Sequence, residues 1–135
     1  MATQHASGPF EVKLQPEPLS LAAVHTGIGR MSLDKVFHGD LTAVSHGEML
    51  AFKTHVQGSA GYVVLEKVTG KLGGRTGSFV LQHSSTMNQG VPTQSITVVP
   101  DSGTDQLTGL SGSMTIRITD GQHDYQFDYV LPVRD

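Results

Sequence analysis

The stretch Tyr62-Val-Val-Leu-Glu-Lys-Val-Thr-Gly-Lys-Leu-Gly-Gly-Arg-Thr-Gly-Ser-Phe-Val-Leu-Gln-His-Ser-Ser-Thr-Met87 decides the fold of this chain. On both sides of its central glycine pair, apolar and polar residues alternate with a period of two, which is typical of β-strands. Gly73 and Gly74 supply the conformational freedom that a hairpin turn needs. The stretch therefore predicts two antiparallel strands, Tyr62 to Leu72 and Ser78 to Met87.

The same alternation recurs along the rest of the chain, so that about eight strands are expected. Pro16 and Pro18 predict the end of the first strand, and Gly47 predicts a bend or bulge within the third. No stretch of eleven or more residues has the 3.6-residue period of a helix longer than a turn or two. The other predicted strands are Phe10 to Leu14, Gly29 to Phe37, Leu41 to Val56, Ser95 to Val99, Ser113 to Thr119 and Tyr125 to Leu131.

The length of the chain favours a single domain over residues 1–135, because 135 residues bury one hydrophobic core. Sixteen glycines, spread along the chain, are typical of many turns. Short strands joined by hairpins leave two exposed edges, and closure into a barrel removes them. We therefore expect an all-β fold with one closed eight-stranded antiparallel barrel, with a two-sheet sandwich as the alternative.

Composition excludes several kinds of function. Charged residues make up 16% of the chain and its net charge is −3, without the basic stripe that a nucleic-acid partner requires. The absence of cysteine excludes disulfides, thiol nucleophiles and cysteine metal sites. No apolar run approaches the roughly 20 residues that span a bilayer, and Met1 to Phe10 lacks the features of a signal peptide. We expect a soluble, cytoplasmic protein without nucleic-acid or membrane partners.

Five motifs resemble the bacterial domain-of-unknown-function family 3224, over nearly the whole chain. This resemblance implies a barrel like those of plant allene oxide cyclases and dirigent proteins, which commonly form symmetric homo-oligomers. The segment from Ser102 to Gly112 is similar to the glycine-rich stretch before a late strand of those barrels. The family has no settled activity to transfer, and fold alone does not determine function. The motifs are Arg30-Met-Ser-Leu-Asp-Lys-Val-Phe-His-Gly-Asp-Leu41, Gly58-Ser-Ala-Gly-Tyr-Val-Val-Leu-Glu66, Gly74-Arg-Thr-Gly-Ser-Phe-Val-Leu-Gln-His-Ser-Ser-Thr-Met87, Val98-Val-Pro-Asp-Ser-Gly-Thr104 and Leu107-Thr-Gly-Leu-Ser-Gly112.

Two titratable residues of the central hairpin are the candidate catalytic residues. Glu66 and His83 lie at equal distances from the midpoint between Gly74 and Arg75, so a symmetric hairpin makes them close cross-strand neighbours on one face. If Phe79 points into the barrel, His83 shares its face. A partly buried carboxylate beside an imidazole can exchange protons with a ligand. The same pair also fits a purely structural ion pair or hydrogen bond.

Aromatic and apolar residues on the predicted inward faces are candidate ligand-binding residues, since an eight-stranded barrel can hold one small molecule. A core role explains the same residues equally well. Arg30, with Asp34 and Lys35, is a candidate for binding an anionic group at the mouth, although mixed charges usually mark a solvated surface. The candidate ligand-binding residues are Tyr62, Phe79, Leu81, Tyr125, Tyr129 and Arg30.

Signatures of cofactors and metals do not occur in the sequence. The seven histidines form no paired spacing beyond the weak His46 and Glu48, and Gly70 to Gly77 lacks the Lys-Ser/Thr of a phosphate loop. No cofactor or metal is therefore expected. Two hypotheses stay open: a barrel that binds a small apolar or flat organic molecule, and an isomerase or cyclase that holds a flexible substrate while Glu66 and His83 assist one proton transfer. Apolar residues on both faces of Tyr62 to Leu65 suggest a homo-oligomer.

Overall fold

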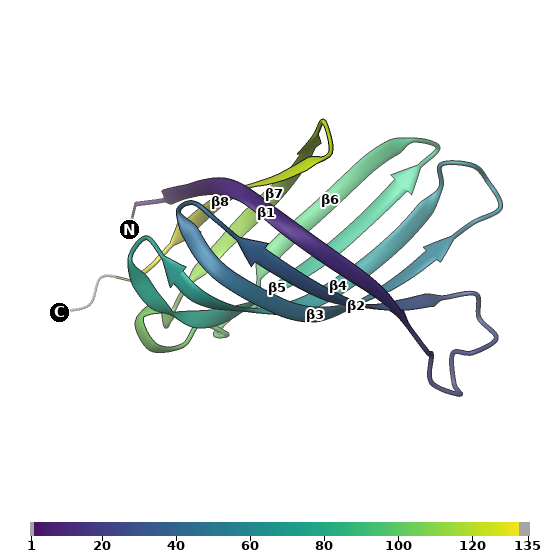
Figure 1. Ribbon diagram of the computed structural model, residues 1–135, viewed down its shortest axis with the longest axis horizontal. Helices are drawn as coiled ribbons and strands as arrows, with labels where there is room; N and C mark the ends of the chain where they lie inside the picture. Colours follow the sequence, from purple (N-terminus) through teal and green to yellow (C-terminus); the bar gives the residue numbers. More distant parts are fainter. Residues whose placement is uncertain (1, 133–135) are drawn as a thin grey trace.

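The computed structural model describes residues 2–132, and within them eight antiparallel strands form a closed barrel (Figure 1). Neighbours in sequence are neighbours in the sheet, and the first strand pairs with the last. This confirms the predicted barrel and shows that the sandwich alternative is wrong. The strands are β1 (Gln4–Glu17), β2 (Gly29–Phe37), β3 (Leu41–Lys53), β4 (Ala60–Leu72), β5 (Arg75–Asn88), β6 (Val91–Val98), β7 (Ser111–Thr119) and β8 (Gln122–Val130).

Strand β1 extends well beyond the predicted segment and includes Pro16, which we expected to end it. The reason lies in how β1 pairs. Residues 4–10 pair with β8, whereas residues 10–17 pair with β2, so the second half of β1 has a strand on one side only. A proline is tolerated in such a strand because its missing N–H can face the unpaired side.

The turn between β4 and β5 sets the register of the central hairpin. Gly73 and Gly74 have φ angles of 56° and 83°, so both occupy the left-handed region that favours glycine. This two-residue turn places Leu72 opposite Arg75. The hairpin is therefore centred between the two glycines, one residue earlier than the symmetric arrangement that we expected.

Strand β3 runs without interruption through Gly47, where the sequence predicted a bend or bulge. A Cβ at Gly47 would lie 2.1 Å from the carbonyl oxygen of Leu65 and 2.8 Å from the Cβ of Glu66. Glycine is therefore needed there for the close approach of β3 to β4, rather than for a turn. The missing side chain leaves the space that Glu66 occupies inside the barrel.

One end of the barrel is closed by packed side chains. Phe37, Phe79 and Phe127 are each about 1% exposed or less, and the ring centroids of Phe79 and Phe127 lie 5.9 Å apart. The loop between β6 and β7 covers this end with two leucines that are almost fully buried, Leu107 in the short 3-10 helix η1 (Asp105–Leu107) and Leu110. This is the end from which the two ends of the chain emerge (Figure 1).

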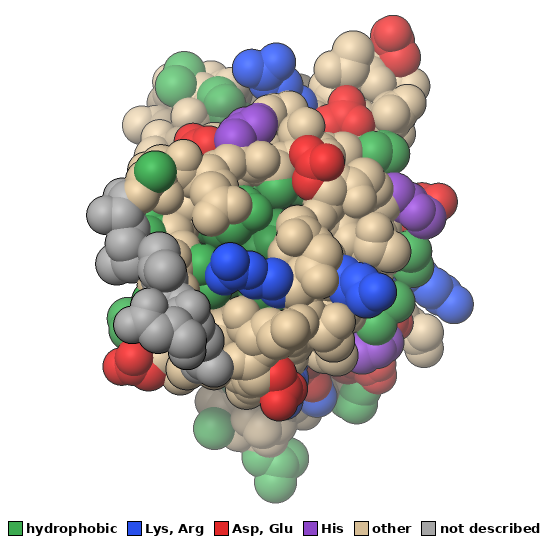
Figure 2. Space-filling model, turned by 90° about the vertical axis from the view of Figure 1, so that its left-hand side faces the viewer, with side chains coloured by type: hydrophobic (Ala, Val, Ile, Leu, Met, Phe, Trp, Pro, Cys, Tyr) green, Lys and Arg blue, Asp and Glu red, His purple; other side chains and the backbone are tan. Residues whose placement is uncertain are grey.

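The visible face of the closed end carries side chains of both charges, and neither sign forms a patch of its own (Figure 2). Viewed from this side, acidic and basic side chains are scattered over the visible face, and hydrophobic side chains show near its centre beside a basic one (Figure 2). Among the residues that the structure describes, no helix is long and apolar enough to cross a membrane.

The opposite end of the barrel is open because β6 and β7 barely pair. Only Ile96 with Met114 and Thr97 with Ser113 face each other across this seam. Beyond these pairs the backbone N–H of Ile116 donates a hydrogen bond to the side-chain Oε1 of Gln94, at 3.2 Å, rather than to a strand neighbour. The wall is therefore loosely closed at this position, and the interior next to it is accessible.

The alternation of the central hairpin predicts which leucines stabilise the barrel. Leu81→Ala should lower the free energy of unfolding by about 2–5 kcal/mol, because Leu81 is fully buried and its removal leaves a cavity. Leu65→Ala is the matched control, since Leu65 lies on the adjacent strand and is 57% exposed. Urea denaturation of both variants measures the difference, and equal losses would contradict the assignment of faces.

Candidate functional site

A buried carboxylate lies at the centre of the barrel and accepts three hydrogen bonds. The Oε1 atom of Glu66 on β4 lies 3.0 Å from Lys35 Nζ on β2 and 2.9 Å from His83 Nε2 on β5. Its Oε2 atom accepts a hydrogen bond from Ser45 Oγ on β3, at 3.0 Å. Four consecutive strands thus each contribute one residue, and we call Lys35, Ser45, Glu66 and His83 the polar cluster.

Lys35 is the positive charge of the polar cluster and is only 4% exposed. Its ammonium group lies 5.1 Å and 5.7 Å from the ring centroids of Phe10 and Phe37, distances at which a cation is attracted to an aromatic face. Glu66 balances its charge. An ion pair buried to this extent is tolerated only when its polar atoms have partners, and among the described residues no buried side-chain nitrogen or oxygen lacks one.

His83 lies diagonally across the hairpin from Glu66. In the observed register Glu66 faces Leu81 and Val64 faces His83, an offset of two residues from the expected pairing. Because the side-chain period of a strand is also two, this offset keeps Glu66 and His83 on the inward face. The predicted pair is therefore present. Any catalytic role for it stays a prediction.

The second ring nitrogen of His83, Nδ1, has no hydrogen-bond partner among the described residues. In that part of the chain no buried side-chain nitrogen or oxygen lacks a partner, so Nδ1 must be reached by solvent. The residue is only 3% exposed and lines the cavity above the polar cluster. We infer that Nδ1 faces this cavity, because the other half of the barrel interior is packed.

The polar cluster keeps Glu66 ionised. Burial alone would raise the pKa of this carboxyl, but the hydrogen bond from His83 and the positive charge of Lys35 outweigh burial and lower the pKa below its ordinary value. The carboxylate therefore acts as a hydrogen-bond acceptor for all three partners near neutral pH.

A cavity of about 190 Å³ lies between the polar cluster and the open end of the barrel. It is somewhat larger than the roughly 150 Å³ engineered cavity that holds benzene. Its polar floor is formed by Lys35 and His83, and Gln94 and His123 are further polar residues of its wall. The rest of the wall is mainly apolar. The apolar residues are Phe10, Val12, Leu14, Leu33, Met49, Val64, Ile116 and Ile118.

Four predicted ligand-binding residues lie in the packed half of the barrel and not at this cavity. Phe79 and Leu81 are buried in the core, and Phe127 separates the rings of Phe79 and Tyr129. The Tyr125 hydroxyl donates to the carbonyl of His38 and accepts from the N–H of Leu41, which stabilises the turn between β2 and β3. The burial of Tyr125 raises the pKa of its hydroxyl. We therefore assign these residues to the core.

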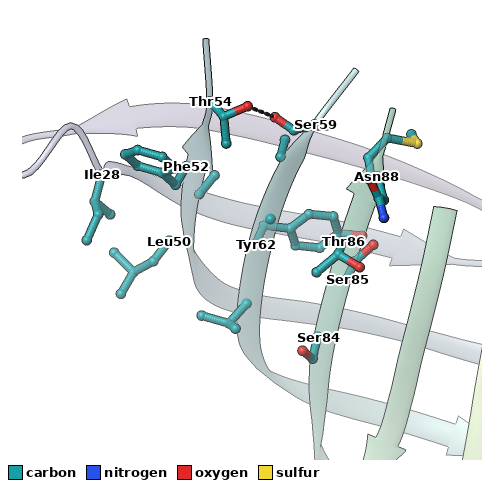
Figure 3. Close-up of a pocket in the computed structure, with 15 residues that line it drawn as sticks. Ile28, Leu50, Phe52, Thr54, Ser59, Tyr62, Ser84, Ser85, Thr86 and Asn88 are labelled. Atoms are coloured by element: carbon teal, nitrogen blue, oxygen red, sulfur yellow. Dashed lines mark hydrogen bonds between the residues drawn. The ribbon is translucent and has the colours of Figure 1, made fainter. Parts of the chain in front are cut away.

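Tyr62 is the predicted ligand-binding residue that does line the cavity. It also borders a groove of about 630 Å³ on the rim of the open end, which includes Leu50 and Phe52. Figure 3 shows the ring of Tyr62 extending from β4 towards Ser85 and Thr86 of β5. Tyr62 therefore lies at the boundary between the rim groove and the interior.

Arg30 does not reach the interior. Its guanidinium group donates to both carboxylate oxygens of Glu48 and to the carbonyl oxygen of Pro18. These contacts hold the Arg30 side chain on the outer surface, beside the loop that follows β1. They account for its position without a ligand.

Sequence reasoning missed two members of the polar cluster. Its neighbours in sequence group Lys35 with Arg30 and Asp34 as a charge of the mouth, but it is in phase with Leu33 and Phe37 on the inward face of β2. Ser45 is likewise in phase with the buried Ala43. A lysine on an otherwise apolar strand face was the signal that could have identified a partner for Glu66.

The described part of the chain contains no group of three or more His, Cys, Asp or Glu side chains arranged to hold a metal ion. Three of the exposed histidines, His5 among them, instead form pairs with single carboxylates. His46 pairs with Asp34, and His38 pairs with Glu11.

Comparisons with known proteins identify relatives of unknown function. A family model described as "Protein of unknown function (DUF3224)" matches residues 6–129. The chain is also similar to a crystal structure of a protein of unknown function from the same family of Shewanella oneidensis MR-1. The two are 49% identical with a TM-score of 0.90, over 98% of this chain and 100% of the other. A search of curated proteins finds no match.

Removing the charge of Glu66 tests the polar cluster. Glu66→Gln should lower the free energy of unfolding at pH 7 by about 3–5 kcal/mol, because the ammonium of Lys35 would remain buried without a balancing charge. The pKa of Glu66 is lower in the folded than in the unfolded chain, so ionisation stabilises the fold above the ordinary value of 4.5. This contribution is lost as the pH falls through the folded pKa, so the difference between wild type and variant should narrow in acid.

Glu48→Gln is the control for this measurement. Glu48 also pairs with a cation, Arg30, but on the surface, where an ion pair contributes little. Urea denaturation between pH 3 and pH 7 should show a much smaller and flatter effect for Glu48→Gln. A similar pH dependence for the two variants would show that burial of the polar cluster does not control stability.

Proposed function

The chain belongs to the DUF3224 family, whose function is unknown, and from the geometry of its site we propose that it binds a small organic molecule in the open half of the barrel. The observation that carries the proposal is an apolar cavity that ends on a buried polar cluster. Ligand sites generally combine apolar walls with a few fixed polar groups. The apolar wall would hold the body of the molecule, while His83 and Lys35 would contact its polar end.

The shape of the barrel supports this proposal. The half below Glu66 is packed, whereas the half above it opens towards solvent where β6 and β7 diverge. A molecule could therefore enter without unfolding a strand. The volume of about 190 Å³ limits the bound part to roughly the size of a substituted benzene ring.

Catalysis of an isomerisation or cyclisation is the second candidate function. The observation that favours it is the contact between Glu66 and His83, because a carboxylate that orients an imidazole leaves the other ring nitrogen free to take a proton. The cavity would hold a flexible substrate in one shape. Turnover of unsaturated or epoxide compounds, lost in Glu66→Gln, would distinguish catalysis from binding. Activity that survives this substitution would exclude the proposed acid and base role.

We also propose that the chain associates with a second copy of itself. Outer-face side chains on neighbouring strands form an apolar surface in the single chain, and Val36, Val44, Leu50, Val63 and Leu65 are 42–57% exposed. A second copy of the chain could cover them. Sedimentation of the purified protein as a strict monomer would remove this part of the proposal.

A larger side chain in the cavity should block binding. Toluene added to the wild-type protein should shift the amide NMR signals of Val64 and Ile116 and raise the melting temperature, because a ligand bound only by the folded state stabilises it. Met49→Trp should abolish both effects, since Met49 lines the cavity. The neighbouring Leu50→Trp, which points outward and is 44% exposed in wild type, should leave them intact. Equal binding by both variants would place the ligand elsewhere.

A further inference from the structure

The hydrogen-bond count at Glu66 determines where His83 carries its proton. An ionised carboxylate only accepts hydrogen bonds, so each of its three partners must supply a proton. Lys35 and Ser45 do so through their ammonium and hydroxyl groups. His83 must therefore donate from Nε2, which lies 2.9 Å from Oε1.

The charge of the polar cluster indicates which form of His83 completes it. Lys35 already balances the charge of Glu66, so a neutral imidazole gives the buried group zero net charge. A protonated imidazole would add a positive charge that none of the other three members balances. In a neutral imidazole with its proton on Nε2, Nδ1 carries a lone pair and accepts hydrogen bonds. This is the atom that we infer to face the cavity, because it has no partner among the described residues and the opposite half of the interior is packed.

From this arrangement, and resting on the proposed function, we propose that the cavity selects hydroxyl compounds, with the ligand O–H donating to His83 Nδ1. The ligand class is a neutral alcohol or phenol with an apolar body. A single hydroxyl group matches the single accessible acceptor at the floor, and the apolar wall contacts the remainder of the molecule. The site would therefore favour ligands that carry one hydrogen-bond donor over ligands that carry none.

Other polar ends fit this site less well. A carboxylate would place its lone pairs against the lone pair of Nδ1, and the charge of Lys35 in the floor is already balanced by Glu66, so no free countercharge would compensate. An ammonium group would lie close to the positive charge of Lys35. An amide could donate to Nδ1, but its carbonyl oxygen would be left against apolar side chains such as Leu33 and Val64.

The test compares compounds of matched size. Phenol and toluene differ only by a hydroxyl in place of a methyl group, and benzoate replaces the methyl group of toluene with a carboxylate. In NMR titrations at pH 7, phenol should bind the wild-type protein at least about fivefold more tightly than toluene, as one added hydrogen bond allows. Benzoate should not bind. His83→Phe, which removes the acceptor but retains a ring, should lose the preference for phenol.

A second measurement needs no substitution. Two-bond ¹H–¹⁵N spectra of the wild-type protein report which ring nitrogen of His83 is protonated, and they should show the proton on Nε2. A proton on Nδ1, or toluene binding as tightly as phenol, would overturn the inference but leave the proposed function standing. Failure of both toluene and phenol to bind would overturn the proposed function, and this inference with it.

Discussion

An ionised carboxylate inside a narrow barrel can persist only if donors surround it, and the arrangement of four strands follows from that requirement. Glu66 is 1% exposed and receives hydrogen bonds from three different strands. Moving a carboxylate from water to a protein interior costs several kcal/mol unless such partners are present. A shift of β2, β3 or β5 by one residue would turn its donor outward, because the side-chain period is two. The polar cluster therefore opposes any change of register in half of the barrel.

The polar cluster also separates two kinds of interior. On one side, aromatic residues fill the barrel and the loop with Leu107 and Leu110 covers its end. On the other side, β6 and β7 lose contact after two residue pairs, and a side chain, Gln94, takes the place of a backbone partner. Gln94, Ile116 and Ile118 of this loosely paired wall line the cavity. The cavity therefore lies in the half of the barrel where the wall is least complete.

Much of this arrangement could be predicted from the period-two pattern. Alternation placed Glu66 and His83 on one face, and the glycine pair brought their strands together, so the centre of the site followed from the sequence. The pattern does not reveal how far along the barrel axis an inward residue lies, because that depends on the stagger between strands. For this reason the pattern does not distinguish Tyr62, which lies at the cavity, from Tyr125, which lies in the packed half. The extent of β1 beyond Pro16 also depends on pairing, which one strand alone does not encode.

Hydrogen bonds within the polar cluster satisfy its buried charges but do not by themselves explain why the cluster is there. Lys35, Ser45 and Glu66 satisfy one another, and aromatic rings cover the remaining face of the ammonium. Replacing a buried ion pair by apolar side chains of similar volume is often neutral or stabilising, so packing alone gives no reason for this cluster. His83 adds a donor to an already balanced carboxylate and lines a cavity with a mainly apolar wall. On the proposed function, a molecule bound in the cavity would use the second ring nitrogen of His83, and such use would account for an imidazole at this position.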